Sequence, residues 1–212
     1  MLIAPYDGSG GARRALELLG LRPALVISIE RDKECKQVID IKWPGCVHFP
    51  EVHTVSQDQW KQALEKYPDL THGIIVGGPP CQGFSGANSR REHFDDERSD
   101  EIDHYVAMVQ TLKALKPDIV WHDCMENVSS MDESDKNTIT QKVSVIRTSG
   151  SEPYEFDAAQ IGPQNRPRSY WTSWEFPEVG QFVVKANRNG NRVILKRSPA
   201  IAAKDYPSMT YF

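Results

Sequence analysis

One short stretch, a buried strand that runs into a stiff loop, constrains this chain more than any other feature. The apolar run Gly73-Ile74-Ile75-Val76 is typical of a strand in a parallel sheet. The loop Gly77-Gly78-Pro79-Pro80-Cys81-Gln82-Gly83-Phe84-Ser85 follows, where glycines permit a sharp turn and prolines restrict the backbone. Such a loop would hold the Cys81 thiol in the crevice where α/β sheets bind ligands. The alternative is a strand-ending turn with an incidental buried cysteine.

Strands and helices alternate over most of the chain. The apolar pattern predicts strands at Leu2–Tyr6, Ala24–Ile29, Val47–Phe49, Gly73–Val76 and Asp118–Met125, and helices at Ala12–Leu19, Lys33–Ile41, Gln57–Tyr67, Glu101–Lys116 and Ser134–Ile146. Gly20 would cap the first helix, and Ser134 or Asp132 would cap the last. This alternation predicts crossover units, and therefore an α/β fold with a mostly parallel, Rossmann-like sheet and helices on both faces.

The pattern changes after Gly150, where short β segments replace helices. Tyr154–Ala159 and Ser169–Phe176 are predicted strands, and Phe182–Lys185 and Arg192–Lys196 flank an Asn-Gly turn that predicts a hairpin. The hairpin region is basic and would suit phosphate groups, although a solvated hairpin fits equally well. Residues 89–104 are highly charged, which on composition alone indicates a solvated loop leading into a helix.

The composition excludes some classes of protein. The 212 residues suit one large domain, or one domain with a small appendage. The net charge of −4 means that any nucleic-acid surface must be local. Apolar runs are too short for a membrane span, and no basic segment precedes the first strand, so we expect no membrane association and no signal peptide. The four well-separated cysteines predict free thiols in an intracellular, reducing compartment.

A glycine-rich turn, Tyr6-Asp7-Gly8-Ser9-Gly10-Gly11, opens the first predicted helix, and Glu30 follows the second strand. Such a turn lets a ligand approach the backbone closely, and an acid at the position of Glu30 usually binds a ribose diol. A nicotinamide cofactor is compatible with this pattern. However, the negative charge of Asp7 disfavours a pyrophosphate, so S-adenosylmethionine, with a ribose and a cationic centre, fits better.

Three further groups are candidates for chemistry. Cys81 and Glu126 follow successive parallel strands, which places a thiol and a carboxyl group at the same edge of the sheet. Arg166 and Arg168, separated by one proline, suit recognition of an anion or a carbonyl. The alternatives are a polar strand end for Glu126 and ordinary surface charges for the two arginines.

Taken together, these motifs resemble those of the cytosine-5 DNA methyltransferases. The chain is similar to that family in its cofactor turn at Tyr6–Gly11, its Pro-Cys-Gln loop at Pro80–Gln82, its Glu-Asn-Val at Glu126–Val128 and its Gln-x-Arg-x-Arg at Gln164–Arg168. The four motifs occur in the family's order, and Ser134-Asp135-Lys136 is closest to the de novo (type 3) branch. The resemblance implies a catalytic domain over residues 1–176 and a partial target-recognition region over residues 177–212.

The resemblance also implies a mechanism on flipped-out cytosine in double-stranded DNA. Cys81 would attack C6, Glu126 would engage N3 and the exocyclic amine, and Arg168 with Arg166 would hold the base carbonyl. S-adenosylmethionine would give its methyl group and leave as S-adenosylhomocysteine. The cofactor would be bound by Tyr6, Asp7, Gly8, Gly10, Gly11, Glu30, Arg31, Glu51, Val52 and Pro79, and DNA by Gln82, Ser85, Asn88, Arg90, Arg91, Gln164, Arg188 and Arg192.

The family's last two motifs and most of its recognition region have no counterpart in this sequence. This departure allows a split enzyme completed by a second protein chain, a truncated or minimal enzyme, or a non-catalytic, DNA-binding regulatory paralogue. Retention of Cys81, Glu126 and both arginines favours catalysis. A tRNA-directed relative ranks lower because its Cys-Phe-Thr motif is missing, and no histidine motif supports a Cys–His hydrolase. Cys46, His48 and His53 have the wrong spacing for structural zinc.

Overall fold

The computed structural model describes residues 1–80, 100–147, 152–158 and 166–174, and the backbone of 180–185 and 192–197. Its elements in chain order are β1 (Leu2–Pro5), α1 (Gly11–Leu18), β2 (Val26–Ile29), α2 (Lys33–Lys42), β3 (Val47–Phe49), the short 3-10 helix η1 (Val52–Thr54), α3 (Gln57–Glu65), β4 (His72–Gly77), α4 (Asp100–Leu115), β5 (Val120–Val128), α5 (Glu133–Ser144), β6 (Tyr154–Asp157), β7 (Pro167–Thr172), β8 (Gly180–Lys185) and β9 (Arg192–Arg197).

Seven strands form one sheet in the order β3-β2-β1-β4-β5-β7-β6. The first five strands pair in parallel, whereas β7 runs antiparallel to both β5 and β6. The sheet order changes direction between β1 and β4, the type of position where open α/β sheets bind ligands. The predicted α/β fold with a mostly parallel sheet is confirmed.

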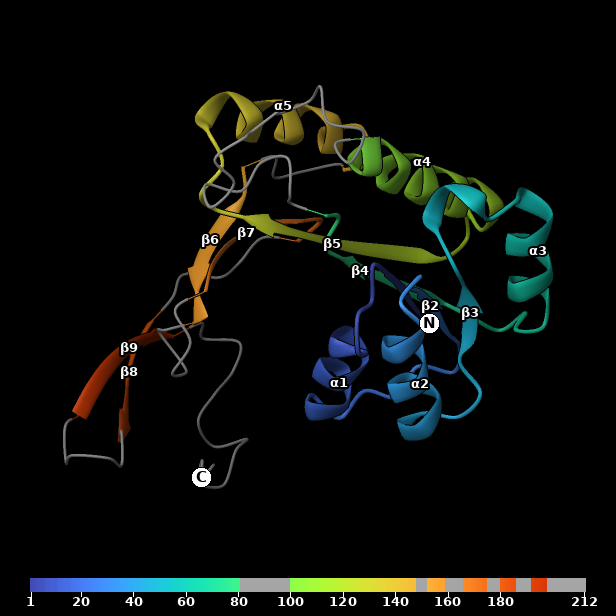
Figure 1. The fold of residues 1–212 in the computed structure, drawn as a ribbon, viewed down its shortest axis with the longest axis horizontal. Helices are drawn as coiled ribbons and strands as arrows, with labels where there is room; N and C mark the ends of the chain where they lie inside the picture. Colours follow the sequence, from blue (N-terminus) through green and yellow to red (C-terminus); the bar gives the residue numbers. More distant parts are fainter. Residues whose placement is uncertain (81–99, 148–151, 159–165, 175–179, 186–191, 198–212) are drawn as a thin grey trace.

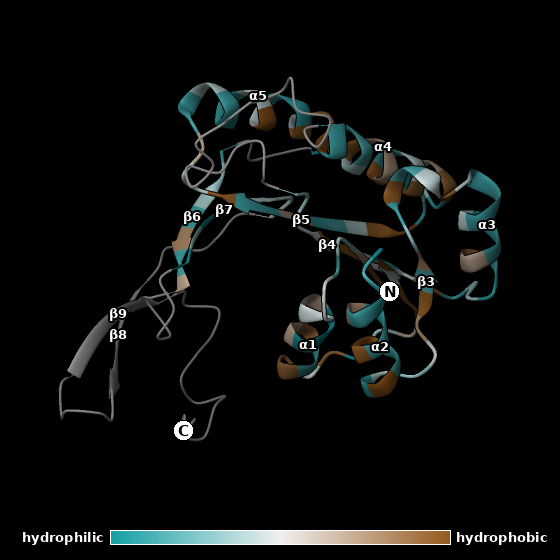
Figure 2. Ribbon diagram, viewed as in Figure 1, coloured by the Kyte–Doolittle hydropathy of each residue, from teal (hydrophilic) through white to brown (hydrophobic). Residues whose placement is uncertain are grey.

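Helices cover the two faces of the sheet unequally (Figure 1). Helices α1 and α2 lie on one side, against β1 and β2, while α3, α4 and α5 lie on the other side. The main core forms between the sheet and this second group of helices, and it includes Ile75, Tyr105, Leu112 and Trp171, all fully buried. Figure 2 shows a further feature of α1 and α2, which carry hydrophobic residues on parts directed away from the sheet.

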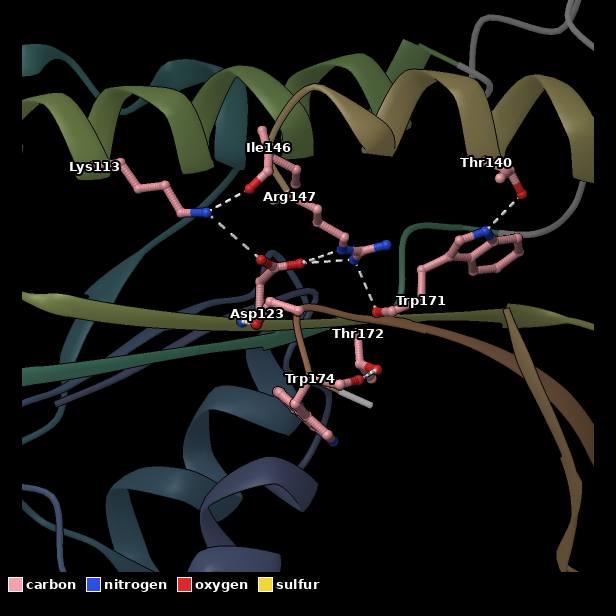
Figure 3. A network of polar contacts seen from close by, with 9 residues as sticks. Lys113, Asp123, Thr140, Ile146, Arg147, Trp171, Thr172 and Trp174 are labelled. Atoms are coloured by element: carbon pink, nitrogen blue, oxygen red, sulfur yellow. Dashed lines mark hydrogen bonds and ion pairs between the residues drawn. The ribbon is translucent and has the colours of Figure 1, made fainter. Parts of the chain in front are cut away.

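A buried ion pair fastens β5 to the segment that follows α5 (Figure 3). The Arg147 guanidinium donates to Asp123 Oδ2 from both Nε (2.9 Å) and Nη2 (2.6 Å), and Nη2 also donates to the Trp171 carbonyl on β7 at 2.8 Å. Lys113 on α4 approaches the other carboxylate oxygen at 3.7 Å. Because Asp123 is completely buried, this network fixes where β5 and β7 lie beneath α4 and α5.

Element boundaries differ from the predictions mainly around β5 and β7. The predicted strand Asp118–Met125 begins later and continues through Glu126 to Val128, because β7 pairs along that end. Strand β7, the antiparallel partner of β5, lies at Pro167–Thr172, whereas the predicted strand was Ser169–Phe176. Of the two cap candidates for α5, Asp132 takes the N-cap position, although its side chain forms no capping hydrogen bond.

Two local predictions near the ends of the chain are confirmed. Gly20, with φ of 77°, follows α1, and its N–H donates to the Glu17 carbonyl at 2.9 Å while the Leu21 N–H donates to Leu16 at 2.9 Å. This is a Schellman arrangement, which satisfies carbonyls at the helix end. Strands β8 and β9 pair antiparallel, with Lys185 opposite Arg192.

Within the described ranges, no helix has the length and apolar character to cross a membrane.

Candidate active site

The turn between β1 and α1 contains two positions whose backbone conformation favours glycine. Gly8 and Gly10 have φ of 56° and 87°, in the left-handed region that favours glycine. A Cβ atom on Gly10 would also clash with the Trp43 ring. The Gly10 N–H donates to the Asp7 carbonyl at 3.2 Å, and Gly11 then begins α1. The predicted turn therefore exists, with Asp7, Gly8, Gly10 and Gly11 in one tight loop.

Glu30, which follows β2, fastens this turn to the neighbouring strand. Its Oε2 accepts a hydrogen bond from the Gly8 N–H at 2.8 Å, and its Oε1 accepts one from the Asp32 N–H at 2.8 Å. A carboxylate oxygen can accept more than one hydrogen bond, so both oxygens keep acceptor capacity for a ligand hydroxyl. Glu30 thus shapes the turn and faces the adjoining pocket at the same time.

Asp7 lies in the turn with a carboxyl group that is costly to ionise. Burial, followed by repulsion from Glu30, raises its pKa from 3.8 to about 6. Its Oδ1 atom is buried and accepts no hydrogen bond from the described residues. A buried acceptor of this kind suits a cationic donor from a ligand.

A pocket opens beside the turn, and its lining confirms that several predicted cofactor residues lie together. It is lined by Tyr6, Ile29, Glu30, Arg31, Pro50, Glu51, Val52, Pro80 and Glu101. Tyr6, Glu30, Arg31, Glu51 and Val52 were predicted from sequence, whereas Asp7, Gly8, Gly10, Gly11 and Pro79 are not part of the lining. Three carboxylates face one guanidinium, which favours a cationic ligand over a phosphate.

Sequence reasoning missed Glu101 in this pocket. It belongs to the first turn of α4, and its side chain accepts a hydrogen bond from the Tyr6 hydroxyl. In the sequence Glu101 is one of many charges between residues 89 and 104. No spacing rule separates it from its neighbours, because its position depends on how α4 packs against the cofactor turn.

Glu126 lies inside β5, where β7 brings both predicted arginines to it. Arg168 Nε is 2.5 Å from Glu126 Oε1, and Arg166 Nη2 is 3.9 Å from the same oxygen. Val128 on β5 pairs with Arg168 on β7, so the antiparallel register sets this contact. The predicted acid and arginines therefore form one charged cluster, in which Arg168 is held close and Arg166 is more exposed.

The start of the cysteine loop lies directly against this cluster. A Cβ atom on Gly78 would come 2.5 Å from Glu126 Oε2, and one on Gly77 would come 2.5 Å from the Pro5 carbonyl oxygen. The Asn127 side-chain amide donates to the Pro79 carbonyl at 3.4 Å. The two glycines thus let one loop pass between the cofactor turn and Glu126. Cys81 itself lies outside the described residues.

The three described cysteines have properties unlike those of a nucleophile. The pKa of Cys124 is raised to about 12 by burial, and the pKa values of Cys35 and Cys46 are also raised, each first by burial. A thiol must ionise to act as a nucleophile. All three are free thiols, as predicted from their spacing.

The predicted DNA contacts remain predictions. Gln82, Ser85, Asn88, Arg90, Arg91, Gln164 and Arg188 lie outside the described residues, as does Cys81. For Arg192 the structure gives the position in β9, opposite Lys185, without its side chain.

Comparison with known proteins agrees with this geometry. The family of C-5 cytosine-specific DNA methylases matches residues 3–192. Type II methyltransferase M.AquIA of Picosynechococcus is 27% identical over 156 residues, which is 73% of this chain and 58% of that protein. Orphan methyltransferase M.Rho11sI of Bacillus phage rho11s is 30% identical over 194 residues, 87% of this chain and 35% of that protein.

Solved structures show the same fold. The Entamoeba histolytica methyltransferase EhMeth superposes with a TM-score of 0.56 at 17% identity, covering 82% of this chain and 53% of that one. The chain therefore spans about half the length of this methyltransferase. The family match covers most of the sequence, and the turn, pocket, acid and arginines occupy one edge of the matched fold. The chain belongs to the family of C-5 cytosine-specific DNA methylases.

Proposed function

We propose that this protein transfers a methyl group from S-adenosylmethionine to C5 of cytosine in double-stranded DNA. The observation that carries the proposal is the contact of Gly78 with Glu126 on one side, while Gly77 contacts Pro5, beside the cofactor turn, on the other. A loop in this position would present the following Cys81 between a base-binding acid and a cofactor pocket. This arrangement would bring a nucleophile, an acid and a methyl donor to a single point.

The residues of the cofactor pocket fit S-adenosylmethionine, which when bound supplies an electrophilic methyl group. The buried Oδ1 of Asp7, in the turn beside the pocket, would accept from the amino group of the methionine part. Tyr6, Glu51 and Val52 would surround the adenine, and Glu30 would accept from the ribose hydroxyls, with Arg31 at the rim. The acidic lining opposes a nicotinamide dinucleotide, because its pyrophosphate is doubly negative.

In the proposed reaction the cytosine leaves the duplex stack and enters the site. The Cys81 thiolate adds to C6, forming an S–C6 bond, while Glu126 protonates or hydrogen-bonds N3 so that electron density gathers at C5. C5 would then take the methyl group, with S-adenosylhomocysteine as the leaving group. Water would accept the C5 proton, and cleavage of the S–C6 bond would restore the aromatic ring and release Cys81 as the thiolate. Arg168 would orient Glu126 and, with Arg166, hold the base carbonyl.

DNA contacts are proposed for two parts of the chain. The first part comprises residues that are close in sequence to the groups proposed to act on the base. Close to Cys81 are Gln82, Ser85, Asn88, Arg90 and Arg91, and Gln164 precedes Arg166 and Arg168. Arg188 and Arg192 belong to the basic hairpin in the proposed recognition region, residues 177–212. Replacing Arg188 and Arg192 by alanine should reduce the slope of log affinity against log salt by about two. An unchanged slope would remove the hairpin from the interface.

We also propose that a second protein chain completes the enzyme. Large apolar side chains are exposed on or beside α1 and α2, two helices whose ribbons are partly hydrophobic in Figure 2. They are Leu18, Leu19, Leu21, Val38 and Ile41. Val120 and Trp174 are exposed on β5 and just after β7. A partner chain that packed on these side chains would remove their apolar surface from water. Full turnover by the isolated chain, with activity per mole independent of concentration, would contradict this part of the proposal.

The proposed activity is tested by tritiated-methyl transfer to cytosine-containing duplex DNA. The purified chain is assayed alone and with its candidate partner, beside Cys81→Ser and the control Cys35→Ser. Activity that disappears only in Cys81→Ser supports the enzyme. Cofactor and DNA binding without any transfer, in the presence of the partner, would favour the non-catalytic regulatory alternative. We propose that this reaction takes place inside a cell.

A further inference from the structure

The pocket contains one residue whose role the family resemblance does not assign. Glu101 lines the pocket together with Tyr6 and Glu30, yet it comes from α4, on the opposite side of the turn. The contacts of its carboxylate indicate what it does. This inference rests on the proposed use of S-adenosylmethionine.

Tyr6 needs an external constraint to hold its position. It has φ of 55°, and it is the one residue other than glycine with positive φ in the described part of the chain. The left-handed conformation is unfavourable for residues other than glycine, so it persists only where surrounding contacts determine it. Tyr6 therefore depends on the groups that hold its ring against the pocket.

Glu101 supplies that constraint. The Tyr6 hydroxyl lies 2.8 Å from Glu101 Oε2 and 3.0 Å from the Glu101 backbone oxygen, so both acceptors belong to one residue. Burial, and then the hydrogen bond to Glu101, raise the pKa of Tyr6 above its ordinary value. The hydroxyl consequently remains a donor at every working pH. A phenylalanine at this position could not form the contact.

One oxygen of Glu101 is left for a ligand. Tyr6 uses Oε2, and within the described residues Oε1 accepts no hydrogen bond. Since the side chain lines the pocket opposite Glu30, Oε1 can accept from a hydroxyl or amino group of a bound nucleoside. Asp103, two residues further along α4, instead pairs with Lys142 on α5.

We propose that Glu101 is a cofactor-binding residue that holds the Tyr6 ring with one carboxylate oxygen and accepts from the nucleoside with the other. The two roles predict coupled effects on affinity. Tyr6→Phe removes only the hydroxyl, Glu101→Gln replaces one acceptor by a donor, and Glu101→Ala removes both functions. Asp103→Ala is a matched control, because it removes a carboxylate from the same helical turn outside the pocket.

The experiment measures the Kd of S-adenosylhomocysteine by calorimetry on the whole chain, with thermal unfolding of each unliganded variant as a check on folding. Glu101→Ala should raise Kd about tenfold, Tyr6→Phe and Glu101→Gln about threefold each, and Asp103→Ala less than twofold. Adding Tyr6→Phe to Glu101→Ala should cause a smaller further loss than Tyr6→Phe causes in the wild type, because the side-chain acceptor is already gone and only the Glu101 backbone oxygen remains for the hydroxyl.

The outcomes separate this inference from the proposed function. If wild type binds neither S-adenosylhomocysteine nor S-adenosylmethionine, the proposed cofactor is wrong. If wild type binds and Glu101→Ala binds within twofold of it, Glu101 is no cofactor residue and the inference alone is overturned. Equal losses in Glu101→Ala and Asp103→Ala would show a general charge effect and would also overturn it. Additive losses in the double variant would contradict the coupling of Glu101 to Tyr6.

Discussion

The two halves of the sheet differ in how fully they are covered. Every residue of β1 and β2 is buried, because α1 and α2 pack on one face and the larger helical group packs on the other. Along β5 burial alternates, so that Asp123 and Met125 are buried while Val120 is 51% exposed. Parallel strands are ordinarily covered on both faces. Strands β1 and β2 are therefore covered on both faces, whereas β5, which carries Glu126, has one face that is only partly buried among the described residues.

The difference bears on function. The cofactor pocket is built from buried strands, a tight turn and short hydrogen bonds. The acid and arginines lie where β5 departs from the parallel pattern and pairs with antiparallel β7. Binding of cofactor and handling of the base should therefore be separable by mutation.

The largest expected effect is on the catalytic half alone. Glu126→Gln should lower methyl transfer by about a hundred- to ten-thousand-fold, because the amide cannot protonate N3. Affinity for S-adenosylhomocysteine should stay within about twofold, since Glu126 does not line the cofactor pocket. Steady-state transfer and calorimetry measure the two quantities. Glu155→Gln, an exposed acid on β6, is the control and should behave as wild type. Parallel losses of both quantities in Glu126→Gln would refute the separation.

The ion pair under β5 should matter more for stability than any surface pair. Arg147→Met leaves the Asp123 carboxylate buried without its main partner, which should cost roughly 3–5 kcal/mol of unfolding free energy. Urea denaturation measures this value. The control, Lys142→Met, breaks an exposed pair with Asp103 and should cost less than about 1 kcal/mol. Similar costs for the two variants would mean that the buried pair does not hold β5 and β7 together.

Removing the charge of Asp7 should make the protein more stable and its binding of S-adenosylmethionine weaker. The pKa of the Asp7 carboxyl group is about 6 in the folded protein, against an ordinary value of 3.8. The folded state therefore keeps the proton up to a higher pH than the unfolded state does. Stability should therefore fall as pH rises from about 4 to about 6. Asp7→Asn removes that loss, which predicts a gain of roughly 3 kcal/mol at pH 7.5 and less than about 1 kcal/mol at pH 4. The same variant should bind S-adenosylmethionine more weakly.

Urea unfolding at the two pH values, followed by calorimetry at pH 7.5, checks both parts of this prediction. Asn is close in size to Asp and removes only the ionisation. An equal gain at both pH values would show that packing, not charge, explains the change.

The smallest expected effect tests the partly buried face of β5 directly. Val120→Thr should change the unfolding free energy of the isolated chain by less than about 0.5 kcal/mol, because the side chain is half exposed. Ile75→Ala, on the covered face of neighbouring β4, should cost roughly 2–5 kcal/mol. Denaturation curves of the two variants give the contrast. A cost above 1 kcal/mol for Val120→Thr would mean that this face is already covered.

The fold and the cofactor turn could be predicted from the sequence, because both depend largely on residues that are neighbours along the chain. Apolar runs gave the parallel strands, and Gly8 and Gly10 take the left-handed conformations that such a turn requires. The extension of β5 through Glu126 could not be predicted in this way, since it depends on pairing with a strand some forty residues later. Glu101 was missed for the same reason, because its contact with Tyr6 spans 95 positions. Long-range packing decided both.

The central claim is that the Cys81 thiol bonds to a cytosine ring carbon, and trapping on a duplex with 5-fluorocytosine tests it most directly. The fluorine blocks the final elimination, so the enzyme should remain attached to DNA. We predict a denaturation-stable protein–DNA adduct that requires S-adenosylmethionine, forms with wild type and Cys124→Ser, and fails with Cys81→Ser. An adduct that persists in Cys81→Ser, or cytosine methylation by wild type without any adduct, would contradict the account.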